Sequence, residues 1–208
     1  MPGFEEVRLG QLLAAEPLAG VRQQEPHGTA TMPYVTATRI SGGPAFIDSE
    51  PEDRTQAVPP GRTTWPGDIL LASRGVERRE TVPGAIVRLS QPLAYSESLV
   101  RIRIDPNRAD PDYVRLFLTS KAGAARLAAV ASGTTISYLR PGAVEGIKLS
   151  LPALEVQRAV AAEITAMEGR LAELQATVGT FGSLVEWTIE GIITGALTLR
   201  DIEPNAQG

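Results

Sequence analysis

Residues 154–192 read LEVQRAVAAEITAMEGRLAELQATVGTFGSLVEWTIEGI, and this stretch carries a regular apolar spacing. Its apolar residues recur at alternating intervals of four and three, which is the heptad pattern of a helix that pairs with another helix. The stripe is narrower than the apolar face of a helix that lies on a globular core. We therefore predict a long pairing helix. The stripe consists of Val160, Ile164, Met167, Leu171, Leu174, Val178, Phe181 and Val185.

Three glycines, Gly169, Gly179 and Gly182, lie inside this predicted helix. Each costs about 1 kcal/mol relative to alanine in a helix interior, so we expect a bend or a break between Gly179 and Gly182. A helix that folds back at this point would close the apolar stripe within one chain. A straight helix needs a partner helix from elsewhere.

The length and composition of the chain suit one soluble domain in addition to the helix. The chain has 208 residues, of which 43% are hydrophobic and 21% are charged, so one ordinary domain plus the helix accounts for it. No apolar run reaches the roughly 18 residues of a membrane span, and the N-terminal residues lack the apolar core of a signal peptide. We expect a cytoplasmic protein with no membrane partner.

The residue types that most enzymes use are scarce. The chain has no cysteine and one histidine, His27, which we expect to be an ordinary surface residue. Turn and helix-cap roles explain the carboxylates that could hold a metal. We therefore predict no catalytic residue, no metal and no cofactor bound by this chain. The carboxylates concerned are Asp68, Asp105, Asp110 and Asp112.

Charge is divided unevenly along the chain. Residues 154–208 carry 3 basic and 8 acidic side chains, whereas residues 1–153 carry 17 and 16. Between Arg54 and Arg103 eight arginines stand against four carboxylates. A basic zone of this size fits either a phosphate-binding surface or a solvated one, and charge alone does not separate the two.

Residues 1–153 have the pattern of a β-rich domain, and the whole chain is predicted to be α+β. The expected order is a globular domain with a mixed, β-rich core, the long coiled-coil helix at 154–192 and a C-terminal tail at 193–208. Helices are expected at 5–15, 110–118 and 122–131, and strands at 32–40, 69–72, 85–89, 98–104 and 147–151.

Two features of this domain could touch a ligand. Alternation in strand 98–104 places Arg101 and Arg103 on one face, which is either a solvated face of an edge strand or a phosphate contact. The hydroxyl-rich loop 132–139 is either a turn with local caps or a phosphate-binding loop.

Several segments, taken in order, resemble the specificity subunit of Type I restriction-modification enzymes. They are WPGDILLAS (65–73) with the arginine-rich loop after it, DPDYVRLFLTS (110–120), ASGTTISYLRPGAVEGIKLSLPALEVQRAVAAEI (131–164) and IEGIITGALTLRD (189–201). Residues 133–157 carry the strongest part of the likeness. The motif at 67–70 is weak alone, but the ordered set covers almost the whole chain.

The resemblance implies a non-catalytic DNA-reading scaffold in a system of defence against foreign DNA. Its partners would be double-stranded DNA and DNA methyltransferase subunits that use S-adenosylmethionine, with or without a restriction subunit. The family usually has two target recognition domains, each followed by a helix, and the two helices pair antiparallel. This chain has one of each, so it resembles a half-length subunit that forms a homodimer or pairs with a different half.

The DNA-reading hypothesis names candidate contacts in two loops. Arginine pairs most often with guanine at base edges, and Arg74, Arg78 and Arg79 are the candidates for this role. Candidates for phosphate contacts are Ser73, Thr134, Thr135, Ser137 and Tyr138, with Arg101 and Arg103 as weaker choices.

The alternative is a protein-protein adaptor that recruits a partner through the helix without specific DNA binding. The two hypotheses differ in where the loops at 74–79 and 134–138 lie. If the loops are on opposite sides of the domain, no single duplex can touch both.

Overall fold

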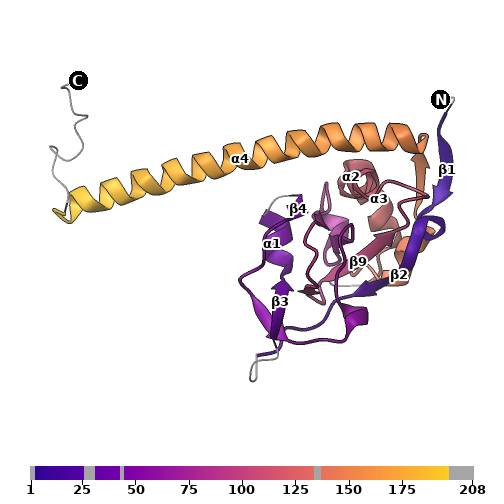
Figure 1. Ribbon diagram of the computed structural model, residues 1–208, viewed down its shortest axis with the longest axis horizontal. Coiled ribbons are helices and arrows are strands. Elements are labelled where there is room, and N and C mark those ends of the chain that lie inside the picture. Colours follow the sequence, from indigo (N-terminus) through magenta and orange to yellow (C-terminus); the bar gives the residue numbers. More distant parts are fainter. Residues whose placement is uncertain (1–2, 26–30, 43–44, 134–136, 197–208) are drawn as a thin grey trace. The chain divides into compact units, whose positions relative to one another are not determined.

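A computed structural model describes residues 3–25, 31–42, 45–133 and 137–196 (Figure 1). The chain divides into two units, Met1–Thr165 and Ala166–Gly208. The first unit is a mixed α+β domain with β-rich sheets, and the second contains most of the long C-terminal helix. The predicted fold class is therefore confirmed, and His27 lies outside the described residues.

A five-stranded sheet forms the centre of the domain. Its strand β6 carries alternating side chains, so Ile69 and Leu71 join the core on one face while Leu70 joins the core on the other. Neighbouring strands are antiparallel except for the parallel pair β4 and β7. The strand order is β2 (Leu13–Ala19), β9 (Leu99–Ile104), β6 (Ile69–Ala72), β7 (Gly84–Val87) and β4 (Phe46–Ile47).

Two helices, α2 (Pro111–Thr119) and α3 (Lys121–Val130), bury side chains in the larger of these cores. The Tyr113 N–H donates to the side chain of Asp110 at 2.9 Å, which is the expected cap at the start of α2. Leu118 of α2 and Leu127 of α3 are fully buried. The helices predicted at 110–118 and 122–131 are therefore present as α2 and α3, and the strands predicted at 69–72, 85–89 and 98–104 are present as β6, β7 and β9.

A smaller sheet consists of β5 (Arg54–Gln56), β3 (Thr31–Val35) and β8 (Ala94–Tyr95). The predicted strand at 32–40 is therefore correct only in its first half, because helix α1 (Ala37–Gly42) follows β3. The hydroxyl of Thr36 accepts the Arg39 N–H at 3.3 Å, and this local bond favours a helix start over continued strand.

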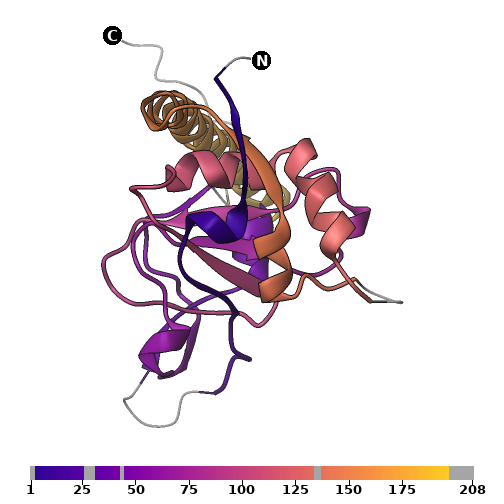
Figure 2. The same cartoon turned by 90° about the vertical axis from the view of Figure 1, so that its right-hand side faces the viewer.

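The predicted N-terminal helix at 5–15 is wrong. This segment is instead β1 (Glu5–Arg8), the 3-10 helix η1 (Leu9–Leu12) and the start of β2. Strand β1 pairs antiparallel with β10 (Lys148–Leu151), and Figure 2 shows the two side by side. The apolar spacing misled because Leu9 and Leu12 enter the core from a single tight turn. Three more 3-10 helices are η2 (Pro60–Arg62), η3 (Val76–Arg78) and η4 (Pro141–Gly146).

The long helix α4 runs without interruption over Leu154–Ile193, so of the predicted bend or break at Gly179–Gly182 the break is wrong. Glycine lowers helix stability but removes no backbone hydrogen bond, and about 1 kcal/mol per glycine does not stop a helix of 40 residues. The stripe is therefore not closed by a fold-back within residues 154–193. No helix in the described residues is long and apolar enough to cross a membrane.

Candidate nucleic-acid interface

The arginine loop after β6 and the described part of the hydroxyl-rich loop are hydrogen-bonded to each other. The Gly75 N–H donates to the carbonyl of Ser137 at 2.9 Å, and the Leu139 N–H donates to the carbonyl of Ser73 at 2.7 Å. The two loops therefore lie side by side, on one part of the domain. This placement allows a single duplex to touch both.

Local sequence explains the shape of the arginine loop. Gly75 has a φ of +65°, a backbone conformation that L side chains rarely adopt, and it turns the chain out of the strand. The next residue, Val76, is fully buried and anchors the turn in the core. The side chains of Arg74, Arg78 and Arg79 are left exposed around this anchor.

The side chain of Arg74 has three contacts. Its Nε donates to the hydroxyl of Ser98 at 2.9 Å, and its Nη2 lies 3.5 Å from a carboxylate oxygen of Glu97. Its guanidinium stands 6.0 Å from the centre of the Tyr138 ring, at the outer limit of a cation–π contact. The other oxygen of Glu97 faces Arg22 at 3.8 Å. Tyr138 thus lies beside the guanidinium of Arg74. Its contact with phosphate stays a prediction.

The serine hydroxyls among the candidates are not presented to solvent. The Oγ atoms of Ser73 and Ser137 are buried and have no hydrogen-bond partner within the described residues. Both residues join the loops through their main-chain carbonyls instead. The predicted phosphate contacts Thr134 and Thr135 lie outside the described residues.

Arg101 and Arg103 do not lie on a solvated edge strand, because β9 is flanked by β2 and β6. Arg101 is 3% exposed, and its Nη1 donates to the carbonyls of Gly61 and Thr63 at 3.2 and 3.0 Å. Its position makes it a brace between loops rather than a phosphate contact.

Arg103 forms a two-pronged ion pair with the buried carboxylate of Asp68, with both hydrogen bonds at 2.7 Å. These bonds raise the pKa of Arg103 above its ordinary value, against the opposing effect of burial. The guanidinium also stacks on Trp65 at 5.2 Å. Asp68 further accepts the Trp65 N–H at 2.7 Å, so Arg103 is committed to this cluster.

Sequence reasoning missed Glu97 and Ser98. The carbonyl of Ser98 accepts the Ser73 N–H at 2.9 Å, because antiparallel pairing places the start of β9 beside the end of β6. A prediction of that pairing would have placed both residues next to the arginine loop. Strand positions alone did not reveal it.

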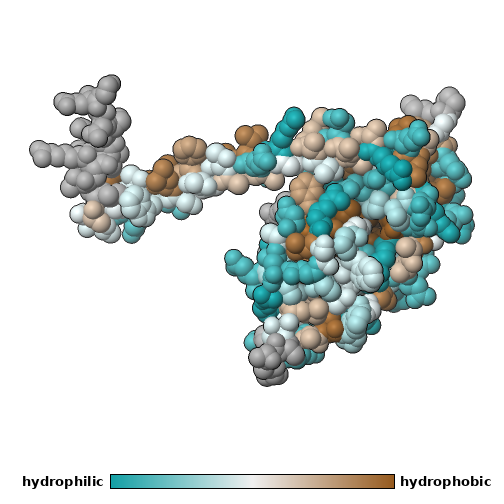
Figure 3. Space-filling view, in the orientation of Figure 1, coloured by the Kyte–Doolittle hydropathy of each residue, from teal (hydrophilic) through white to brown (hydrophobic). Residues whose placement is uncertain are grey.

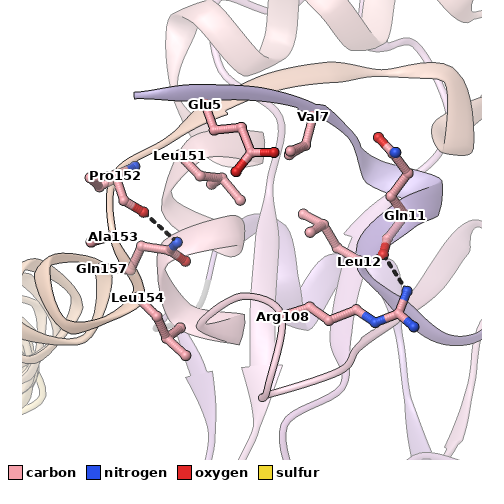
Figure 4. Close-up of a pocket in the computed structure, with 10 residues that line it drawn as sticks. All are labelled: Glu5, Val7, Gln11, Leu12, Arg108, Leu151, Pro152, Ala153, Leu154 and Gln157. Carbon is pink, nitrogen blue, oxygen red and sulfur yellow. Dashed lines mark hydrogen bonds between the residues drawn. The ribbon is translucent and has the colours of Figure 1, made fainter. Parts of the chain in front are cut away.

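A separate cavity of about 500 Å³ lies where the last strand of the domain leads into α4 (Figure 4). The side chain of Gln157 is buried there, donating to the Pro152 carbonyl at 2.8 Å and accepting the Asp110 N–H at 3.0 Å. On the opposite wall, Arg108 donates to the Gln11 carbonyl at 2.7 Å. These bonds tie the first turn of α4 into the domain. None of the predicted DNA contacts lines the cavity.

The apolar stripe of α4 is exposed for most of its length. Figure 3 shows apolar side chains on the surface of the helix. Leu171 and Leu174 are 54% and 64% exposed, and Ile164 is half-buried. The remaining exposed stripe residues are Val160, Met167, Val178, Phe181 and Val185.

Within the described part of the chain, no group of three or more histidine, cysteine, aspartate or glutamate side chains could hold a metal ion. The described groups on this surface are exposed arginines, the Tyr138 ring and main-chain groups. These are the groups with which proteins contact nucleic acid.

Among solved structures, chains of Type I restriction-modification systems have a similar architecture. The S subunit of a Type I restriction-modification system from M. genitalium matches with a TM-score of 0.61 and 18% identity, over 92% of this chain and 46% of that chain. The chain has the fold of a Type I S subunit. A chain from a structure of an assembled type I R-M system matches with a TM-score of 0.56 and 18% identity, over 91% of this chain and 45% of its own.

The chain thus spans about half the length of the S-subunit structures that it matches. The matched share includes both the β-rich domain and the long helix, since it exceeds nine tenths of this chain. No protein-family model matches the sequence, and no curated protein matches it significantly. At 18% identity the S-subunit likeness establishes the fold and assigns no residue a role.

Proposed function

We propose that this chain is a non-catalytic DNA-recognition subunit of a Type I restriction-modification-like complex. The observation that carries the proposal is the union of the arginine loop and the hydroxyl-rich loop through main-chain hydrogen bonds. Base-reading and backbone-positioning groups need to face one duplex together, and this surface brings Arg74 beside Tyr138, with Arg78 and Arg79 exposed further along the same loop. The S-subunit fold supports the same function.

The proposed contacts of Arg74, Arg78 and Arg79 follow from their exposure, whereas those of Thr134 and Thr135, which lie outside the described residues, follow from the sequence alone. Arg74, Arg78 and Arg79 contact base edges or phosphates, and Tyr138 and the neighbouring Thr134 and Thr135 contact the backbone. Ser73 and Ser137 shape the surface through their main chains. Arg101 and Arg103 are set aside because their guanidinium groups are engaged inside the domain.

The second part of the proposal is pairing through α4. A stripe of large apolar side chains exposed to water gains roughly 1.5–3 kcal/mol for each one that becomes fully buried. The partner helix belongs to a second copy of this chain or to a different recognition half. In a symmetric pair, two domains read two half-sites in opposite orientation.

The complex would contain DNA methyltransferase subunits, which use S-adenosylmethionine, with or without a restriction subunit. The formal net charge of −4 weakens attraction to DNA, so the chain alone should bind a duplex poorly and its partners should supply many phosphate contacts. Affinity should therefore rise when the methyltransferase subunit is present.

Anisotropy titration of a labelled mixed-sequence duplex tests the interface, with the chain alone and with its methyltransferase partner. Replacing Arg74, Arg78 and Arg79 together by alanine should lower affinity about tenfold or more and reduce the salt dependence, because up to three cationic contacts are lost. The matched control replaces the exposed residues Arg126, Arg158 and Arg170 by alanine and makes the same change in net charge.

An equal loss in the two triple variants would show that general charge, rather than this surface, attracts DNA. The adaptor hypothesis predicts a different pattern, in which DNA binding is absent under all conditions while a partner protein is still captured through α4. Magnesium-dependent cleavage or modification of DNA by the purified chain alone would contradict the non-catalytic role.

A further inference from the structure

We infer that Arg74 reads a guanine in the major groove, and that Ser98 and Glu97 are positioning residues that aim its guanidinium. The inference rests on the proposed function, because it assigns a base to one side chain of the proposed interface. Arg74 makes three contacts that orient its planar group, of which the hydrogen bond to Ser98 is the shortest.

The atoms that these contacts use determine which edge of the Arg74 guanidinium remains available to a base. Ser98 occupies Nε, and Glu97 lies beside Nη2 on the same side of the guanidinium. Within the described residues no contact engages Nη1, so the end of the group that bears Nη1 and the second proton of Nη2 is available. Two parallel N–H groups at that end match the O6 and N7 acceptors of guanine.

The Tyr138 ring limits how the guanidinium can rotate. The ring centre is 6.0 Å from the guanidinium carbon, and the backbone of Tyr138 is held by the Ser132 carbonyl at 2.8 Å. An arginine whose plane is already restricted loses less conformational freedom when it forms two hydrogen bonds to a base. Arg74 is therefore suited to specific readout more than to loose phosphate attraction.

Glu97 has a second effect because it carries negative charge at a surface that meets DNA. It lies between two guanidinium groups, 3.5 Å from Arg74 and 3.8 Å from Arg22, and all three side chains are at least 41% exposed. Exposed ion pairs contribute little to stability, so the role of Glu97 is orientation. Without it, Arg74 and Arg22 would be freer to contact any phosphate. Its loss should weaken base preference while raising non-specific affinity.

The experiment enriches a duplex pool with a randomised core on the full chain at low salt, where phosphate attraction is strongest, and sequences the bound DNA. The wild-type chain should enrich a motif with a preferred guanine. Arg74→Lys keeps the charge but lacks the two-pronged group, so it should lose roughly a 5- to 150-fold preference at that guanine while other positions persist. Arg170→Lys, on the exposed surface of α4, is the matched control.

Two further variants test the positioning residues. Glu97→Ala and Ser98→Ala should each reduce the guanine preference, and Glu97→Ala should also strengthen binding to unenriched pool DNA. Glu97→Gln keeps a hydrogen-bond acceptor beside Nη2 and should restore part of the preference. Each variant is compared with the wild-type chain by thermal melting, so that a folding defect is not mistaken for lost readout.

The outcomes separate this inference from the proposed function. Wild-type enrichment of a motif whose guanine preference survives Arg74→Lys overturns the reading role of Arg74 and leaves DNA recognition standing. Unchanged preference in both Glu97→Ala and Ser98→Ala overturns their positioning role. A wild-type chain that binds no pool DNA, alone or with its methyltransferase partner, removes the proposed function itself.

Discussion

Leucines in two regions of this molecule have opposite environments. Leu70 and Leu71 of the central sheet are fully buried, whereas Leu171 and Leu174 of α4 are more than half exposed. The domain satisfies its apolar residues internally, since the sheet has a core on each face. The helix concentrates them on a narrow stripe, which only another helix covers well. The domain thus buries most of its large apolar side chains, whereas the helix leaves a stripe of them exposed.

The largest test of this contrast changes Leu171 and Leu174 to lysine. In a symmetric pair four leucines are lost, which removes roughly 6 kcal/mol or more of burial energy, or more than four orders of magnitude in Kd. Sedimentation or light scattering should show a wild-type dimer and a monomeric variant.

The control for this test adds two lysines outside the stripe. Ala176→Lys with Thr180→Lys introduces the same charge on the other side of the helix, and association should persist. A wild-type chain that is monomeric, with or without a second recognition half, would refute pairing through α4.

A smaller effect on stability is expected when glycine is changed to alanine in the domain and in α4. A Cβ on Gly123 of α3 would lie 2.0 Å from the Phe117 carbonyl oxygen, so Gly123→Ala should destabilise the domain by about 1–3 kcal/mol or more. A Cβ on Gly179 or Gly182 meets nothing within 4 Å, and alanine there should stabilise α4 by about 1 kcal/mol per site. Urea unfolding monitored by circular dichroism measures the first change, and amide exchange along α4 measures the second. The same sign at both locations would erase the distinction between the regions.

The smallest expected effect is a change in the pKa of Glu6, which lies in strand β1. A hydrogen bond from Lys148 lowers the pKa of Glu6, so the stabilisation by this pair is present above the unfolded-state pKa and is lost as the pH falls through the lowered folded-state pKa. Lys148→Met should let the pKa of Glu6 rise toward its ordinary value, as measured by NMR titration of its carboxyl carbon. Lys121→Met, which removes a lysine paired with Glu80, should leave the Glu6 titration unchanged.

Sequence patterns predicted the elements whose signals are local. The Asp110–Pro111 start of α2, the apolar run of β6 and the heptad spacing of α4 each depend on neighbouring residues, and all three elements are present. The helix predicted at 5–15 was wrong because the spacing of Leu9 and Leu12 suits a single 3-10 turn as well as an α-helix. Each glycine does lower the stability of the helix, as expected, but the loss is too small to interrupt α4.

The predicted interface shows the same limit at the level of single side chains. The two loops were identified from their composition, but their pairing depends on the contact between Gly75 and Ser137, which are 62 positions apart in the sequence. Arg101 and Arg103 were misjudged because alternation within one strand does not reveal whether that strand has neighbours on both sides. Glu97 and Ser98 were missed for a related reason, since only strand pairing brings them to Arg74.

The pairing of β1 with β10 has a consequence for the order in which the molecule forms during synthesis. Glu5 aligns with Leu151, so the first strand stays without its neighbour until almost the entire domain has left the ribosome. At about 5–20 residues per second this wait lasts roughly 7–30 s. Because such a distant contact completes late, the domain acquires its last strand just before the apolar stripe of α4 emerges. A nascent chain therefore shields its core before it exposes the apolar stripe of α4.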